Sequence, residues 1–152
     1  MERRAARLLA VASAGGHWVQ LLRLRPAFNG FDVIFLTTNK HCRCEADGQR
    51  VHLVNEASRW NKLALLLMAV RVMWVIACVR PDFIVSTGAA PGYIAVRLGR
   101  LIGARTIWID SMANADELSL SGRRVGRYAD LWLTQWPHLA SSSGPNYKGA
   151  VL

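Results

Sequence analysis

The hydrophobic positions of this chain form short runs that alternate with longer segments in which apolar residues recur at helical spacing. Short runs rich in β-branched and aromatic residues predict strands, and apolar residues three or four positions apart predict helices. The predicted strands are residues 8–13, 32–37, 51–54, 83–86, 105–109 and 131–134, and the predicted helices are residues 18–28, 62–79 and 92–102. Strands that are separated by helices favour an α/β fold, with a Rossmann-like parallel sheet and helices on both faces.

Small and polar residues follow four of the predicted strands. The carboxyl ends of parallel strands meet at one edge of the sheet, and ligands bind beyond that edge. We therefore expect these residues to converge on one site. They are Ser13-Ala14-Gly15-Gly16-His17, Thr37-Thr38-Asn39, Ser86-Thr87-Gly88 and Asp110-Ser111.

Paired glycines between a strand and a helix make the first of these segments the most informative. A helix that begins there directs backbone N–H groups and the positive end of its dipole at one spot, which suits phosphate. His17 could hydrogen-bond a diphosphate or take a proton from a sugar hydroxyl. The segment Gly88-Ala89-Ala90-Pro91-Gly92 follows the same logic, since Pro91 is tolerated near a helix start. Two such turns favour a phosphate or sugar site over an ordinary pair of tight turns.

The helix over residues 62–79 is apolar on nearly every side. Residues 63–79 contain one charge, Arg71, and their length is at the lower limit for crossing a bilayer. A central arginine costs about 2.5 to 3.5 kcal/mol on insertion scales, which argues against a full span. We expect the sheet to cover one side of this helix and lipid or a partner to cover the other. A helix in the middle of the core is the alternative.

The chain has 152 residues, which is the size of one domain, and we expect residues 1–152 to form a single unit. Its formal net charge is +9, and sixteen of the nineteen basic residues are arginine. Arginine matches the geometry of phosphate and carboxylate groups, so an anionic lipid, a diphosphate or a nucleic acid could be the partner. The charge alone does not choose among them.

Because the basic residues 1–7 lead directly into the first predicted strand, we expect no cleavable signal sequence. Three cysteines are an odd number, which disfavours a disulfide framework, so we expect a reducing compartment. His41, Cys42, Cys44 and His52 match no common zinc spacing, so we expect no metal site. We expect no cofactor either.

Several motifs, taken in their order along the chain, cover nearly its whole length. They are Ala12-Ser13-Ala14-Gly15-Gly16-His17, Ser86-Thr87-Gly88-Ala89-Ala90-Pro91-Gly92, Leu118-Ser119-Leu120-Ser121-Gly122, Gln135-Trp136-Pro137 and the final residues 147–152. In this order they resemble the membrane-anchoring acceptor-lobe subunit of split MurG-like glycosyltransferases. Members of that family make N-acetylglucosaminyl-diphospho-dolichol in eukaryotes and exopolysaccharide repeat units in bacteria.

The resemblance implies a single N-terminal-type lobe of a two-lobed GT-B glycosyltransferase. Such a subunit binds a polyprenyl-diphosphate-linked sugar, and a separate partner subunit binds the UDP-sugar at the shared interface. It lies at the cytoplasmic face of the plasma (inner) membrane, peripheral or shallowly embedded, and recruits the partner there for polysaccharide or lipid-linked oligosaccharide synthesis. Without the partner we expect it to be inactive.

The resemblance also assigns residues to roles. His17 and Asp110 are the catalytic candidates, and Gln135, Trp136 and Tyr147 are candidates for the partner interface. The chain departs from the family after residue 109, because relatives have a Glu-Ser pair and then an arginine, whereas this chain has Asp110-Ser111 and then Asn114. The candidates for binding the acceptor and its phosphates are Ser13, Gly15, Gly16, Thr87, Gly88, Pro91, Gly92, Ser111, Asn114, Arg123 and Arg124.

Other functional classes fit the sequence less well. The chain lacks the G-x-G-x-x-G spacing of a dinucleotide-binding oxidoreductase. Such a protein also needs an acidic residue near the carboxyl end of its second strand, whereas Asp32 lies at the start of that strand. A nucleic-acid-binding module would cluster its basic residues, which here are scattered, so no nucleic acid partner is expected. No P-loop motif occurs. A non-catalytic membrane scaffold remains the serious alternative, because the sequence shows no paired carboxylates of hydrolase type.

Overall fold

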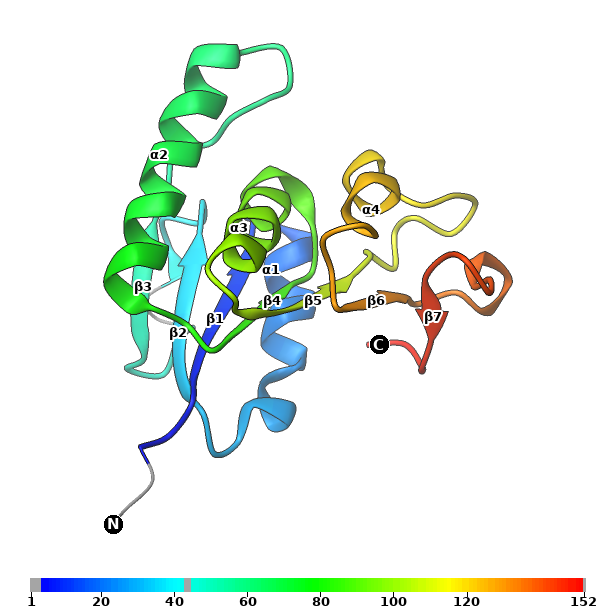
Figure 1. The fold of residues 1–152 in the computed structure, drawn as a ribbon, viewed down its shortest axis with the longest axis horizontal. Helices are drawn as coiled ribbons and strands as arrows, with labels where there is room; N and C mark the ends of the chain where they lie inside the picture. Colours follow the sequence, from blue (N-terminus) through cyan, green and yellow to red (C-terminus); the bar gives the residue numbers. More distant parts are fainter. Residues whose placement is uncertain (1–3, 43–44, 152) are drawn as a thin grey trace.

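One parallel sheet organises the molecule. A computed structural model describes residues 4–42 and 45–151, and within them seven strands pair in the order β3-β2-β1-β4-β5-β6-β7 (Figure 1). Every neighbouring pair of strands is parallel, which confirms the predicted sheet. The strands are β1 Arg7–Ala12, β2 Asp32–Thr37, β3 Arg50–Leu53, β4 Phe83–Ser86, β5 Arg105–Ile109, β6 Leu131–Thr134 and β7 Asn146–Tyr147.

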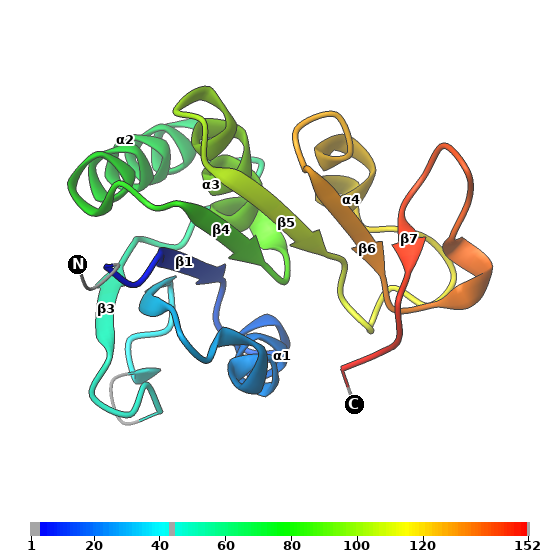
Figure 2. The ribbon, with the colours of Figure 1, turned by 60° about the horizontal axis from the view of Figure 1, so that its bottom comes forward.

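Helices cover both faces of this sheet, as predicted. α1 (Gly16–Arg23) lies on one face, whereas α2 (Lys62–Val79), α3 (Ala89–Leu101) and α4 (Leu120–Val125) lie on the other (Figure 2). Short 3-10 helices, η1 (Arg25–Phe28) and η3 (Pro137–Leu139), complete the connections.

The core has two halves because the central strands are buried on both sides. Successive side chains of a strand point to opposite faces. Leu9 and Val11 of β1 pack with the hydrophobic cluster under α2 and α3, and Leu8 and Ala10 pack with the cluster under α1. Each fully buried leucine contributes about 1.5 to 3 kcal/mol. This two-sided burial explains why the strand reads as a continuous apolar run.

Element ends differ from the predictions where local chemistry intervenes. The helix predicted over residues 18–28 is α1 followed by η1, because Pro26 has no N–H to continue the α-helical hydrogen bonds. α3 begins at Ala89 instead of Gly92, since proline is tolerated in the first turn. β3 begins and ends one residue earlier than predicted. Three elements of the described residues were not predicted, α4, η3 and β7.

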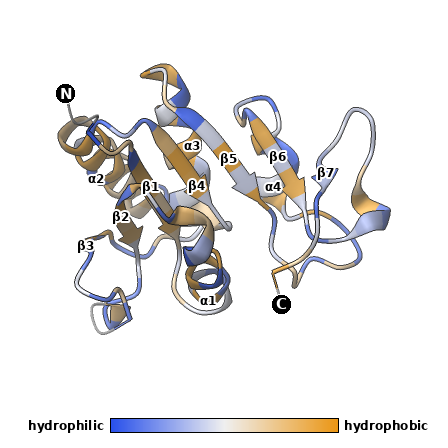
Figure 3. Cartoon of the chain, turned by 90° about the horizontal axis from the view of Figure 1, so that it is seen from below, coloured by the Kyte–Doolittle hydropathy of each residue, from blue (hydrophilic) through white to orange (hydrophobic). Residues whose placement is uncertain are grey.

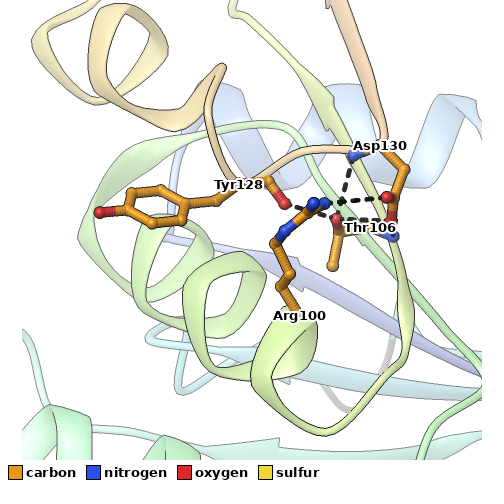
Figure 4. Close-up of polar contacts among 4 residues, drawn as sticks. All are labelled: Arg100, Thr106, Tyr128 and Asp130. Carbon is orange, nitrogen blue, oxygen red and sulfur yellow. Dashed lines mark hydrogen bonds and ion pairs between the residues drawn. The ribbon is translucent and has the colours of Figure 1, made fainter.

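A polar joint closes the amino edge of the sheet, opposite the carboxyl ends. Asp130 accepts hydrogen bonds from the Thr106 N–H (2.8 Å) and Thr106 hydroxyl (3.0 Å), and it pairs with Arg100 at 3.0 Å (Figure 4). The Thr106 hydroxyl also hydrogen-bonds the Tyr128 carbonyl at 2.9 Å. The backbone N–H of Thr106 and, to a lesser extent, its hydroxyl and Arg100 lower the pKa of Asp130 below its ordinary value near 3.8, against a smaller opposing effect of burial. The joint fastens α3 to β5 and to the residue that precedes β6.

Candidate functional site

The strand order of the sheet reverses between β1 and β4. β2 and β3 lie beyond β1 on one side, and β5, β6 and β7 lie beyond β4 on the other. The helices that follow these two strands, α1 and α3, leave toward opposite faces (Figure 2). Parallel α/β sheets bind ligands in the crevice outside such a point. The two glycine turns predicted from the sequence follow β1 and β4, so both lie there.

Backbone geometry explains the glycines at the head of each turn. Gly15 has φ 76° and Gly88 has φ 135°, and each is the residue immediately before a helix. Residues that carry a Cβ rarely adopt these positive φ values, whereas glycine adopts them readily. Both chain reversals therefore depend on glycine, and they leave backbone N–H groups at the starts of α1 and α3.

His17 joins the two turns. Its Nδ1 lies 2.9 Å from the Thr87 carbonyl oxygen, and the Thr87 hydroxyl donates to the His17 carbonyl at 2.7 Å. A carbonyl only accepts, so Nδ1 carries the hydrogen and Nε2 is the ring nitrogen that can take a proton. The ring also packs on Gly88, where an added Cβ would lie 2.6 Å from the ring Cε1 and Nδ1. The half-buried imidazole is thus held in one orientation.

A cleft of about 570 Å³ opens beside these turns at the carboxyl edge of the sheet. Ser13 and Pro91, two of the predicted binding residues, line it. Glu56, which was not among the predicted site residues, also lines it and is exposed. Glu56 follows β3 by three residues, so the rule applied to the other strand ends would have found it. The cleft therefore offers a carboxylate and hydroxyl groups next to the glycine turns.

Gly92 has a packing role. A Cβ at this position would lie 1.9 Å from the Ser86 Oγ and 3.3 Å from the Trp108 ring. The Ser86 Oγ in turn accepts a hydrogen bond from the Gly88 N–H at 3.1 Å. Gly92 is buried and lets α3 approach β4 and β5, so it supports the second turn from behind.

Asp110 is enclosed by hydrogen-bond donors. Its carboxylate is 1% exposed. Oδ1 accepts from the Ser119 hydroxyl (2.6 Å) and Trp108 Nε1 (3.2 Å), and Oδ2 accepts from the Ser119 N–H (2.9 Å) and Asn114 Nδ2 (3.3 Å). None of its hydrogen bonds within the described residues comes from His17. Asp110 therefore orders the loop before α4, and Asn114 is committed to that task.

An amide network ties α1 to the other side of the crevice. Gln20 donates to the Ser111 hydroxyl at 3.0 Å and accepts from Gln135 Nε2 at 2.7 Å. Gln135 also donates to the Asp110 carbonyl and accepts from the Val151 N–H, at 2.9 and 2.8 Å. Ser111 and Gln135 are buried, and Gln135 is 3% exposed. Of the predicted partner contacts, Gln135 is thus an interior residue of the chain, and its role at a partner interface stays a prediction.

The other two predicted partner contacts lie farther out. Trp136 is half-buried, and its Nε1 donates to the Met112 carbonyl at 2.8 Å. Tyr147, on the edge strand β7, is 41% exposed. Tyr147 is therefore the most exposed of the three predicted partner contacts.

The two predicted phosphate-binding arginines of α4 differ in their pairing. Both are exposed. Arg123 forms an ion pair with Glu117 at 2.7 Å. Within residues 4–42 and 45–151, Arg124 makes no hydrogen bond or ion pair, so its charge is the more available of the two.

α2 presents an apolar surface to the outside. We call its exposed side the α2 outer face, which consists of Leu63, Leu66, Leu67, Val70, Met73 and Trp74, each 49–68% exposed. These positions follow helical spacing, and the opposite side buries Met68, Val72, Val75, Ile76 and Val79. In the described part of the chain this helix alone is long and apolar enough to cross a membrane, and Figure 3 shows its hydrophobic colouring. The structure buries 28% of its residues. The sheet therefore covers one side of α2, as predicted, and the alternative of a helix enclosed by the core is wrong.

Cys44, one of the four residues for which no metal site is predicted, lies outside the described residues. Among the described residues no three His, Cys, Asp or Glu side chains gather as metal ligands. Cys42 is buried and Cys78 is exposed.

Comparison with known proteins finds two related sequences. No protein-family model matches the chain. The UDP-N-acetylglucosamine transferase subunit ALG14 of Cryptococcus neoformans is 37% identical over 57 residues, which cover 38% of this chain and 25% of that protein. ALG14 of Mus musculus is 22% identical over 90% of this chain and 78% of that protein.

Solved structures share the fold across nearly the whole chain. MurG of Acinetobacter baumannii aligns with a TM-score of 0.77 and 14% identity over 94% of this chain and 45% of its own. UDP-N-acetylglucosamine 2-epimerase of Rickettsia bellii aligns with a TM-score of 0.70 and 12% identity over 97% and 46%. The chain thus spans less than half of either structure and matches a lobe of the MurG type. Homologous to ALG14 in sequence and like MurG in fold, it is a relative of the split MurG-like glycosyltransferase subunits.

Proposed function

We propose that this chain is the acceptor-binding subunit of a two-component glycosyltransferase. It binds a polyprenyl-diphosphate-linked sugar at the membrane, and a partner subunit supplies the UDP-sugar for polysaccharide or lipid-linked oligosaccharide synthesis. The observation that carries this proposal is His17, held by Thr87 and Gly88 between two glycine turns in a relative of ALG14.

In this proposal the glycine turns receive the acceptor diphosphate. The N–H groups at the starts of α1 and α3, together with Ser13, hydrogen-bond its oxygens. Relatives carry an arginine where this chain has Asn114. In this proposal the unpaired charge of Arg124 attracts the diphosphate in place of that arginine. The acceptor sugar then occupies the cleft lined by Ser13 and Glu56.

His17 acts as the general base. The acceptor hydroxyl oxygen forms a bond to C1 of the donor sugar while the bond from C1 to UDP breaks. The hydroxyl proton passes to His17 Nε2, because Nδ1 is already committed to the Thr87 carbonyl. Asp110 is a positioning residue, since its carboxylate is occupied by Trp108, Asn114 and Ser119.

In this proposal the chain lies at a shallow position on the cytoplasmic face of the plasma (inner) membrane, and the α2 outer face supports the contact with a membrane. The apolar residues of that face adjoin the basic residues Arg59, Lys62 and Arg80. Each basic residue near an anionic surface contributes about 1 kcal/mol of attraction. Arg71, whose guanidinium lies 4.7 Å from the Trp74 ring centroid, argues for contact with the surface instead of a full span.

An activity assay with and without a partner tests the proposal. The chain is purified from membranes with whatever protein binds it and then separated from that protein. We expect the chain alone to transfer no sugar from UDP-sugars to a polyprenyl-diphosphate-N-acetylglucosamine acceptor, and the recombined pair to do so. Robust turnover by the chain alone would overturn the two-component proposal.

A non-catalytic membrane scaffold is the second candidate. The occupied carboxylate of Asp110 favours it, because one of the two catalytic candidates has no free oxygen to offer a substrate. Under this alternative, the complex would transfer sugar at an unchanged rate when His17 is replaced, while loss of the chain would displace the partner from membranes.

A further inference from the structure

The edge strand β3 places a histidine against the outer part of α2 (Figure 1). Val51 and Leu53 of this strand pack with the hydrophobic cluster under α1. His52 alternates with them, so it points to the face of the sheet that carries α2. Its ring meets the Trp74 ring edge to face, with the ring centroids 6.3 Å apart. Trp74 belongs to the α2 outer face and is 49% exposed, so His52 adjoins the surface for which we propose membrane contact.

Charged side chains from three elements gather around this pair of rings. α2 brings Arg71, whose guanidinium lies 4.7 Å from the Trp74 ring centroid. β3 itself brings Arg50, two positions before His52, and β2 brings Asp32, which pairs with Arg50 at 2.8 Å. Arg71 has no ion-pair partner within the described residues. We call Arg50, His52, Arg71 and Trp74 the His52 cluster, and its balance of charge is positive.

The surroundings of His52 disfavour its charged form in the free chain. Burial of the ring, followed by Arg71 and Arg50, lowers the pKa of His52 below its ordinary value of 6.5. The imidazole is therefore neutral at pH 7 and takes up a proton only under more acidic conditions. His52 and Arg50 also line an open hollow of about 440 Å³, so solvent and anionic groups can reach the ring.

An anionic lipid surface would reverse this preference. Its phosphates oppose the positive potential of Arg71 and Arg50 and so favour a charged imidazole between them. Exposed tryptophan rings settle at the level of the lipid headgroups, and Trp74 would thus bring those phosphates close to His52. A contact that favours the protonated form is itself strengthened by protonation, because the two equilibria are linked. A zwitterionic surface carries no net charge and would not have this effect.

We propose that His52 makes the membrane contact of the α2 outer face dependent on pH, because a proton bound by its imidazole beside Trp74 and Arg71 strengthens attachment to anionic phospholipid. The inference rests on the membrane position proposed above and adds a regulation to it. The only covalent change is the bond between one ring nitrogen and a proton taken from water. At higher pH the neutral ring leaves the contact to the apolar side chains and the arginines.

Vesicle sedimentation across pH tests the proposal with the full chain. We expect the dissociation constant for phosphatidylglycerol vesicles to fall about fivefold between about pH 7.5 and about pH 5, the factor that corresponds to about 1 kcal/mol for one added basic group. Carboxyl groups titrate mainly below this range. His52→Gln is neutral at every pH, so it should bind like wild type at the upper pH and lose the gain at the lower one. The matched change His41→Gln, at an exposed histidine outside the cluster, should keep the gain.

A measurement on the unaltered chain guards against a folding defect in the variant. The His52 ring signals are titrated by NMR with phosphatidylglycerol bicelles and with phosphatidylcholine bicelles. We expect a higher pKa of His52 on the anionic bicelles, because only their charge favours the protonated ring. An equal pKa on the two kinds of bicelle would overturn the proposal, and so would a full pH dependence of vesicle binding in His52→Gln.

The same sedimentation data separate this proposal from the proposed function. A chain that binds phosphatidylglycerol vesicles equally well at every pH loses the regulation by His52 and keeps the membrane position. A chain that binds them at no pH loses the membrane position and the regulation with it. The two-component transfer of sugar is measured independently, by the activity assay with and without the partner.

Discussion

At the scale of single residues, the neighbours of His17 hold its side chain in one orientation. Its ring is fixed by the Thr87 carbonyl on one side and by Gly88 on the other. A fixed tautomer leaves one nitrogen for proton transfer, and positioned bases contribute about 10²- to 10⁴-fold to rate.

We therefore predict that His17→Ala lowers turnover of the reconstituted complex at least about a hundredfold, with membrane binding and partner association intact. His17→Gln can still donate a hydrogen bond to the Thr87 carbonyl but cannot accept the proton, so it should be equally slow. Steady-state rates of both variants are compared with those of His41→Ala, an exposed histidine that should retain full activity. Near-wild-type turnover in both His17 variants would remove this residue from the mechanism.

Asp130 gives a second prediction, on stability. Its folded pKa is lowered chiefly by the backbone N–H of Thr106, with its hydroxyl and Arg100 adding to this and burial opposing it. A lowered carboxyl pKa contributes stability above the unfolded pKa, and that contribution is lost as the pH falls through the folded pKa. We expect Asp130→Asn to lower the melting temperature at pH 7 and the difference from wild type to shrink below about pH 4. Thermal unfolding across pH measures this.

The control for that experiment is Asp116→Asn. Asp116 is exposed and makes no hydrogen bond or ion pair within the described part of the chain. Its replacement should leave the melting temperature nearly unchanged at every pH. A constant difference between Asp130→Asn and wild type from pH 7 to pH 3 would contradict the proposed role of the charge.

At the scale of elements, α2 has two apolar sides with different tasks. One side packs on the sheet, and the other is the α2 outer face. Exposed apolar patches of this extent mark a surface that something covers. We predict that Leu67→Glu combined with Val70→Glu lowers binding to phosphatidylglycerol vesicles at least about tenfold, because a buried charge opposes insertion. Both positions are solvent-exposed, so the fold should persist.

Vesicle sedimentation measures this change, with Leu101→Glu as the control. Leu101 is more exposed than either α2 position but lies at the end of α3. High salt should release only part of the wild-type protein, since apolar contact persists when charges are screened. Complete release by salt would show that the outer face does not enter the membrane.

Elements differ in how far their sequence determines them. β1 and α2 carry long apolar patterns, so their place in the fold follows from periodicity. α4 has six residues, too few to show a period, and it begins where Ser119 is held by Asp110. The hydrogen bond between Ser119 and Asp110 joins residues nine positions apart, and no local sequence pattern predicts it.

The same distinction applies to the candidate site. Convergence of the two glycine turns follows from the rule for parallel strands, and the structure confirms it. The orientation of His17 depends on Thr87, seventy residues away, and the interior position of Gln135 depends on Gln20. Such tertiary hydrogen bonds determine which polar side chains can face a ligand and which stabilise the interior.

At the scale of the whole molecule, the proposed membrane and partner surfaces belong to different parts of the fold. α2 packs over the half of the sheet that contains β1 and β2, while Tyr147 lies on β7, at the end of the strand order away from β3 (Figures 1 and 2). Two ligands on separate surfaces can be bound together. The glycine turns at the switch between β1 and β4 lie between these surfaces, where an acceptor from the membrane and a donor from a partner could meet.

This separation predicts that the two functions can be lost independently. Tyr147→Ala should weaken association with the donor-binding partner about tenfold or more, because large aromatic anchors dominate interfaces, while vesicle binding stays unchanged. The Leu67→Glu, Val70→Glu variant should do the reverse: it should hold the partner in solution but fail to bring it to vesicles. Co-sedimentation of the partner, with and without each variant, measures both effects. If either variant abolished both functions in a folded protein, membrane and partner would share one surface, and the chain could not present an acceptor between them.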